Sequence, residues 1–222
     1  MMTRLALTAA GLLLAAQATA ADMKATYAVT FDGTWSQATH PKEYPGSAHF
    51  SGLIGATHAE GYTLFKEGGT ATDGLEKLAE TGSHSPLNQE IQAAIRKGAA
   101  ARLLETGPLF NLPAQIKLTF DIDAAHPMVS LVAMIAPSPD WFAGAASLKL
   151  LENGQWVARQ EVTVYAYDAG TDDGVTYQAA DIEVSPRQPI ARNRSAHFQS
   201  GNAMVPVGKL VFERMGAPAK SS

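Results

Sequence analysis

The chain has 222 residues, of which 46% are hydrophobic and 17% are charged, a composition typical of one globular domain and too apolar for a disordered chain. Its 17 basic and 21 acidic residues give a formal net charge of −4, which argues against a nucleic-acid-binding surface, since such a surface concentrates basic residues. The absence of cysteine excludes disulfides, thiolate metal sites and cysteine nucleophiles.

The first twenty residues have the pattern of a secretory signal peptide. Arg4 precedes an apolar run over residues 5–16, and Ala18-Thr19-Ala20 follows as a small-residue cleavage site. The run is shorter than the roughly twenty residues that cross a bilayer, and no cysteine follows Ala20 to carry a lipid anchor. We therefore expect a secreted or periplasmic protein, cleaved after Ala20, with no transmembrane segment or lipid anchor.

Strands dominate the rest of the sequence, because apolar and polar residues alternate along it. We expect strands near residues 27–31, 116–122, 128–136, 148–151, 156–167 and 207–214. The run over residues 128–136 is almost wholly apolar, which indicates a central strand buried on both faces. This pattern predicts an all-β sandwich.

Helices are expected only as short insertions. Asp73 and Glu76 resemble a capping box at the start of one helix, and Gly82 would end it. A second helix is expected over residues 86–97, with proline at its first position. Residues 21–215 are therefore predicted to form one domain, and residues 216–222 a disordered tail.

Three histidines, His40, His49 and His58, recur at intervals of nine residues. Three imidazoles could form an open zinc site that activates water, as in a periplasmic hydrolase. Alternatively, each makes local hydrogen bonds in a loop or at a strand end, because a nine-residue spacing creates no shared helix face. The sequence contains no nucleophile elbow, zinc-protease helix, P-loop or dinucleotide-binding fingerprint, so we do not expect an enzyme.

Two acidic segments, residues 137–142 and residues 167–174, each follow a predicted strand. Two neighbouring strands of the same sense would bring these segments to one rim of a sandwich. Asp140 belongs to the first segment, whereas Asp168 and Asp172 belong to the second. Three carboxylates within about 5 Å repel by roughly 3 kcal/mol per pair at an effective dielectric near 20, so they must protonate, spread apart or hold a cation. Oxygen ligands alone favour calcium. The alternative is that these aspartates only shape turns.

Several motifs follow one another in a specific order and spacing across residues 26–190. They are Phe31-Asp32-Gly33-Thr34-Trp35-Ser36, His40-Pro41-Lys42-Glu43-Tyr44-Pro45, Ala48-His49-Phe50-Ser51, Ile54-Gly55-Ala56-Thr57-His58, Pro137-Ser138-Pro139-Asp140-Trp141 and Tyr167-Asp168-Ala169-Gly170-Thr171-Asp172. Through these motifs the chain resembles the spondin N-terminal domain family, as a bacterial, secreted, single-domain member.

The resemblance implies an eight-stranded antiparallel β-sandwich similar to calcium-binding C-two-type domains, with one Ca²⁺ ion at a loop rim. It implies Asp140, Asp168 and Asp172 as the ligands of that ion, with Asp173 as an additional acid outside the ligand set or facing solvent. The histidine motifs belong to the shared scaffold in this view. We expect Trp35 and Trp141 to pack beneath their loops, with contact to a partner as the alternative for Trp141.

The expected function is that of a secreted calcium-binding module that binds an unidentified extracellular or envelope partner, protein or glycan, in adhesion. Animal relatives carry cysteines and matrix-associated modules, so their adhesive role is carried over only as an expectation. Two alternatives stay open: a periplasmic metal-dependent hydrolase that uses His40, His49 or His58, and a structural component of the cell envelope.

Overall fold

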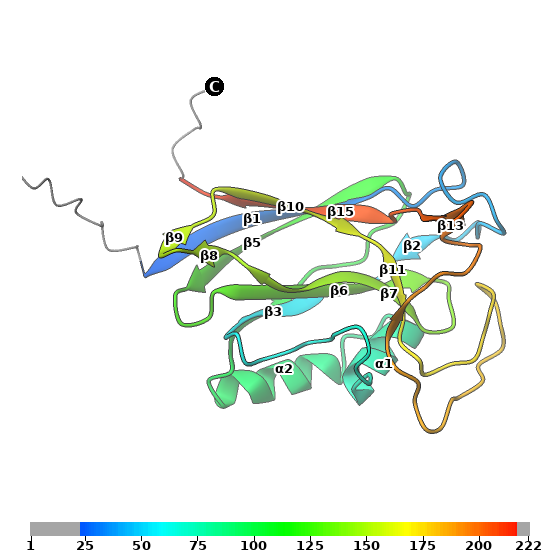
Figure 1. Cartoon of the computed structure of the whole chain (residues 1–222), viewed down its shortest axis with the longest axis horizontal. Coiled ribbons are helices and arrows are strands. Elements are labelled where there is room, and N and C mark those ends of the chain that lie inside the picture. Colours follow the sequence, from blue (N-terminus) through cyan, green and yellow to red (C-terminus); the bar gives the residue numbers. More distant parts are fainter. Residues whose placement is uncertain (1–22, 217–222) are drawn as a thin grey trace, which may run out of the picture.

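The computed structural model describes residues 23–216. The predicted signal peptide and residues 217–222 of the predicted tail lie outside this part. The described residues form two packed antiparallel sheets, with two helices against one of them (Figure 1). Neither helix in this part of the chain is long and apolar enough to cross a membrane.

The first sheet has four antiparallel strands in the order β10-β15-β1-β5. Their bounds are Lys24–Gly33 for β1, Ala114–Asp123 for β5, Arg159–Val164 for β10 and Gly208–Arg214 for β15. In β1 the side chains of Tyr27, Val29 and Phe31 are buried and the residues between them are partly exposed. This confirms the predicted alternation, since successive strand residues face opposite sides of a sheet.

The second sheet runs in the order β12-β11-β7-β6-β3-β4, and β2 pairs with β6 beside this path. The bounds are His49–Phe50 (β2), Ile54–His58 (β3), Ala100–Glu105 (β4), Met128–Ala136 (β6), Trp141–Lys149 (β7), Ala166–Asp168 (β11) and Ala191–Arg192 (β12). Two small hairpins complete the strands: Leu151–Glu152 (β8) with Gln155–Trp156 (β9), and Gln199–Ser200 (β13) with Ala203–Met204 (β14).

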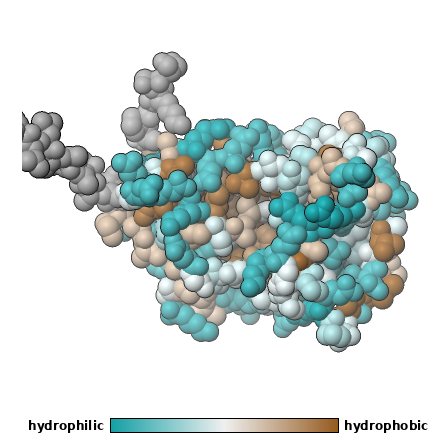
Figure 2. Space-filling model, viewed as in Figure 1, coloured by the Kyte–Doolittle hydropathy of each residue, from teal (hydrophilic) through white to brown (hydrophobic). Residues whose placement is uncertain are grey.

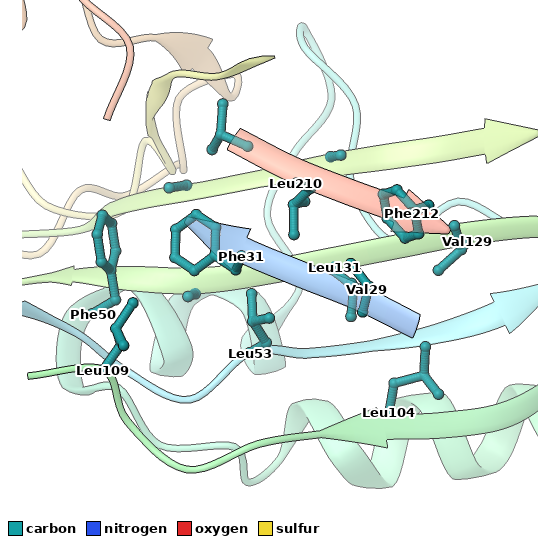
Figure 3. Packing of buried hydrophobic residues seen from close by; sticks show 14 of the residues in the cluster. Val29, Phe31, Phe50, Leu53, Leu104, Leu109, Val129, Leu131, Leu210 and Phe212 are labelled. Carbon is teal, nitrogen blue, oxygen red and sulfur yellow. The ribbon is translucent and has the colours of Figure 1, made fainter. Parts of the chain in front are cut away.

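Two hydrophobic cores lie on opposite faces of the second sheet. The first lies between the sheets, where Leu131 of β6 packs with Val29, Phe31, Leu210 and Phe212 (Figure 3). The second lies between the sheet and the helices, and Val132 of β6 belongs to it. Successive residues of β6 thus enter different cores, which explains why the predicted central strand is apolar on both faces.

Eight of the described strands are five or more residues long, and all of them pair antiparallel. They divide equally between the two sheets, with β3, β4, β6 and β7 in the second. The predicted antiparallel β-sandwich with two short helices is therefore confirmed. The face of the domain in Figure 2 mixes hydrophilic residues with smaller apolar areas.

Both helices lie where the sequence predicts them. Helix α1 spans Asp73–Thr81 and ends at Gly82, whose φ of 70° is the left-handed conformation that favours glycine. Its N-cap is Thr72, whose side chain accepts a backbone N–H of the first turn, so the predicted capping role of Asp73 is wrong. Helix α2 spans Leu87–Arg96 with Pro86 at its N-cap, so the predicted place of this proline at the first helical position is wrong by one residue.

The predicted strands differ from the observed ones in several places. The single strand expected over residues 156–167 is divided among β9, β10 and β11. The strand expected over 148–151 covers the break between β7 and β8. Strand β7 begins at Trp141, inside a segment that the sequence indicates as a loop, and β3 and β4 were not expected.

Candidate functional site

The two acidic segments meet at one end of the sandwich. Asp140 precedes β7 and Asp168 ends β11, and the two strands pair antiparallel with Trp141 opposite Asp168. The backbone N–H of Ala169 also donates to the carbonyl oxygen of Asp140, at 3.2 Å. Because the start of one antiparallel strand faces the end of its neighbour, both acids lie at one rim, where β7 begins and β11 ends (Figure 1). Strands β6 and β11 have the same sense, as predicted, but β7 lies between them.

Asp140 is fully buried and receives most of its hydrogen bonds from the second segment. Its Oδ2 accepts the backbone N–H groups of Thr171 at 2.8 Å and Asp172 at 3.2 Å. Its Oδ1 has no hydrogen-bond partner among the described residues. Burial raises the pKa of this carboxyl above its usual range, and the two backbone donors partly oppose that effect. A buried carboxylate oxygen without a partner is costly unless something compensates its charge.

Asp168 lies at the end of β11, close enough to Asp140 for the charges of the two carboxyls to interact. Its Oδ1 accepts the backbone N–H of Gly170 at 2.9 Å, which closes a turn at a glycine with a φ of 73°. Burial and, to a smaller extent, the charge of Asp140 raise the pKa of Asp168 to about 6. The two carboxyls therefore repel each other at the rim when both are ionised.

Asp172 uses its carboxylate within its own loop. Its Oδ1 accepts the N–H of Gly174 at 2.6 Å, and its Oδ2 accepts the N–H of Ile182 at 3.2 Å. Both contacts shape the loop, as the alternative interpretation of these aspartates expects. The neighbouring Asp173 is exposed.

A metal-binding arrangement of three side chains is not assembled in residues 23–216, where no group of three or more His, Asp or Glu residues is placed to hold an ion. The donor chemistry nevertheless fits calcium, because Asp140 Oδ1 is unpartnered and Asp168 contributes a second carboxylate beside it. Further oxygens would have to come from backbone carbonyls, water or a reoriented Asp172. The assignment of these three residues as metal ligands stays a prediction.

Glu80 of α1 is a rim residue that the sequence analysis missed. Burial raises the pKa of its carboxyl, while a hydrogen bond with Thr171 in the second acidic segment lowers it. A helical glutamate carries no sequence signal for such a contact, since the partners are far apart along the chain.

The three histidines do not come together. His49 pairs with Ala136 and His58 pairs with Met128, at opposite ends of β6. Eight strand residues at about 3.3 Å each separate these ends by about 26 Å, so one metal ion cannot join the rings. His40 is buried against Val205. The geometry gives no support to a hydrolase built on these histidines.

The contribution of His58 to stability is expected to fall as the pH drops below about 6.5. Its ring is fully buried, with Nε2 at 2.8 Å from Oγ of Ser130 and Nδ1 at 2.8 Å from the carbonyl oxygen of Ala59. Burial lowers the pKa of His58, and the charge of His126 adds to that effect. Below the ordinary pKa the unfolded chain binds a proton that the folded ring resists, so acidification favours unfolding until the folded pKa is reached.

Urea midpoints measured between about pH 7.5 and pH 5 would check this expectation. His58→Gln keeps a polar group facing Ser130 and should reduce the loss of stability at low pH. His49→Gln is the control and should retain the wild-type loss, because the ring of His49 lies partly in water. An unchanged pH dependence in the His58 variant would contradict the assignment.

A buried aromatic cluster supports the rim from beneath. Trp35 and Trp141 are 0% and 1% exposed, as expected for residues that pack beneath loops, and each contacts Tyr177, with ring centroids 5.6 and 5.2 Å apart. His197 also packs against Tyr177, and its Nε2 lies 2.8 Å from Oε2 of Glu43. That hydrogen bond lowers the pKa of Glu43. Neither Tyr177 nor His197 was predicted, since no spacing relates them to the other members.

Comparison with known proteins gives a consistent family. A family model described as Spondin_N matches residues 25–204. The chain is 32% identical over 209 residues to Spondin-2 of Rattus norvegicus, and 35% identical over 206 residues to Spondin-1 of Bos taurus. Spondin-1 of Xenopus laevis is 36% identical over 207 residues.

Each of these alignments covers 86% of the chain. The matched part spans 62% of the rat Spondin-2 sequence and 25% of the two Spondin-1 sequences. The similarity therefore extends over most of this chain but only part of the relatives.

Proposed function

We propose, given that this chain belongs to the Spondin_N family, that it is a secreted or periplasmic binding module whose rim is stabilised by calcium. In this proposal Asp140, Asp168 and Asp172 are the metal ligands, and the loops around them bind an extracellular or envelope partner. The bound ion supplies positive charge that offsets the clustered carboxylates.

The observation that carries the calcium proposal is the pair of acids at the rim. Oδ1 of Asp140 is buried and unpartnered, and the charge of Asp140 helps to raise the pKa of Asp168. A hard cation compensates both costs at once, because it binds carboxylate oxygens and neutralises their repulsion.

The described contacts indicate what such an ion would stabilise. Asp140 already joins β7 to the loop of Thr171 and Asp172 through two backbone hydrogen bonds. An ion shared by Asp140 and Asp168 would add a further link between the same two segments. The rim loops would then be held in one conformation for a partner, which reduces the entropy cost of binding.

Calcium is expected to raise the melting temperature of the wild-type protein. A ligand that binds only the folded state stabilises it by about 2.7 kcal/mol at a free concentration 100 times its Kd. For a domain of this size that corresponds to roughly 5–10 °C. Scanning fluorimetry in millimolar calcium and in excess chelator measures the difference, and magnesium should have a smaller effect because it demands stricter geometry.

Two variants with the same change in charge separate the site from general electrostatics. Asp168→Asn should remove most of the calcium effect, whereas Asp173→Asn, at an exposed neighbouring acid, should keep it. Equal melting temperatures in calcium and chelator for the wild-type protein would overturn the calcium site.

The proposed partner is an extracellular or cell-envelope molecule, bound without chemical conversion. Affinity capture from the periplasm or the medium would test this, with Asp168→Asn as the comparison. A partner captured by the wild-type protein in calcium and lost in chelator would support a calcium-dependent binding rim.

A further inference from the structure

Three hollows adjoin one another at the rim end of the sandwich. The first, of about 450 Å³, is lined by Tyr44 and Tyr177. The second, of about 410 Å³, shares Tyr44 with the first and continues to Phe110. The third, of about 570 Å³, shares His49 and Phe110 with the second and reaches the end of α1. We call these three adjoining hollows together the rim groove.

Two aromatic side chains present ring surfaces at separate points of the rim groove. Tyr44 is partly exposed and rests against the buried Trp35, with ring centroids 5.2 Å apart. Phe110 is 53% exposed, and its ring lies 4.9 Å from that of His49. Aromatic rings that are supported from behind and open to solvent suit ligands with flat apolar faces.

The rest of the rim groove is polar, and none of the described residues that line it is lysine or arginine. Asn111 and Gln178 contribute neutral hydrogen-bonding groups, and two histidines also line the groove. Its carboxylates are those of Glu43 and Glu80. An anionic polymer would therefore be repelled, whereas a neutral ligand finds donors and acceptors.

The backbone adopts the left-handed conformation at two residues that line the rim groove. Glu43 and Asn111 have φ angles of 52° and 56°, in the left-handed region. Only four non-glycine residues in the described part of the chain have a positive φ, and these are two of them. Such residues cluster at functional sites, because the surrounding structure must hold them in place. The hydrogen bond from His197 holds the carboxylate of Glu43 beside the first hollow.

A peptide that adds as a β-strand would find no open edge beside the groove at β2. Phe50 and Leu109 exchange both backbone hydrogen bonds, at 3.1 and 3.0 Å. On the other side of the same segment, the N–H of Ser51 donates to the carbonyl oxygen of Met134 at 3.1 Å. Main-chain recognition of an extended peptide is thus blocked at this position.

We propose that the rim groove binds a neutral oligosaccharide in extended form. Its sugar rings would pack on Tyr44 and Phe110, and its hydroxyl groups would bond to Glu43, Asn111 and Gln178. The three adjoining hollows, of about 450, 410 and 570 Å³, offer room for several sugar rings. This inference rests on the proposed binding role of the rim and names the chemical class of its partner.

Calorimetric titration of the full secreted protein with defined hexamers tests the proposal. The neutral probes are the β-1,4-linked hexamers of glucose, N-acetylglucosamine and mannose, and the α-1,4-linked hexamer of glucose. Hexagalacturonate is the anionic comparator, and a proline-rich decapeptide tests the protein alternative. We expect at least one neutral hexamer to bind with a Kd below about 1 mM, and neither comparator to bind as tightly.

Substitutions then locate the bound sugar. Phe110→Ala and Tyr44→Ala should each weaken binding at least about tenfold in protein that circular dichroism shows to be folded. Val175→Ala is the matched control, because Val175 is an apolar residue, 75% exposed, that does not line the groove. Equal weakening by the Val175 and Phe110 variants would overturn the proposal.

Repeating the titration in calcium and in chelator separates this inference from the calcium site. Binding of a neutral hexamer that is weakened by Tyr44→Ala and Phe110→Ala supports the oligosaccharide proposal, whether or not calcium is present. The calcium proposal is decided by the melting-temperature test alone. Failure of all four neutral hexamers at about 10 mM, or tighter binding of either comparator, would overturn the oligosaccharide assignment.

Discussion

Gly55→Ala is expected to destabilise the domain by about 3 kcal/mol or more. Gly55 is the second residue of β3 and pairs with Leu131 of β6. A Cβ atom at this position would lie 1.8 Å from the carbonyl oxygen of Ser130 and 2.9 Å from the Cα of Leu131. Both obstacles are backbone atoms, so strands β3 and β6 would have to move apart in the middle of a closely packed sheet.

Equilibrium unfolding in urea measures this effect, with Gly61→Ala as the control. A Cβ at Gly61 meets no atom within 4 Å, so that variant should stay within about 0.5 kcal/mol of the wild type. A Gly55 variant as stable as the Gly61 variant would show that the two strands tolerate the separation.

The sequence predicts best the strands in which each face keeps one environment, buried or exposed, along the length of the strand. Strand β1 alternates because one face is buried and the other is partly exposed, and β6 is almost wholly apolar because both faces are buried. In each case the hydrophobic pattern of the sequence matches the burial pattern of the structure.

Strand β7 could not be predicted in the same way, because its interior residues are small. Residues 143–146 are Ala-Gly-Ala-Ala, which have little strand preference. The structure shows why small residues are needed: a Cβ on Gly144 would lie 2.3 Å from the carbonyl oxygen of Leu131 in β6. The close approach of β6 and β7 therefore requires small residues here, where strands usually carry β-branched ones.

The acidic rim was predictable in its position but not in its internal contacts. Strand ends bring Asp140 and Asp168 together, which a topological argument can anticipate. The carboxylate of Asp172 accepts the N–H of Ile182, and Glu80 forms a hydrogen bond with Thr171. Both contacts depend on loop conformations that the local sequence does not encode. The rim groove is hidden for the same reason, since several separate segments line it.

Asp140→Ala is expected to lower the stability by about 3 kcal/mol even in chelator, because Asp140 has a structural role that needs no ion. Its Oδ2 is the acceptor for the N–H groups of Thr171 and Asp172, and the site is fully buried. Alanine would leave both donors without this partner in a place that water reaches poorly, at about 1–3 kcal/mol for each unsatisfied group. The segment that carries Asp172 should then detach from β7.

Asp140→Asn separates this hydrogen-bonding role from the proposed ionic one. The amide oxygen can still accept from Thr171 and Asp172, and the loss of negative charge removes repulsion with Asp168. In chelator the asparagine variant should therefore lose less than about 1 kcal/mol. In calcium it should gain little of the wild-type stabilisation, since a neutral amide is a weaker ligand for a hard cation. Urea unfolding of both variants in both conditions gives four free energies, and equal losses for alanine and asparagine in chelator would contradict the acceptor role of Asp140.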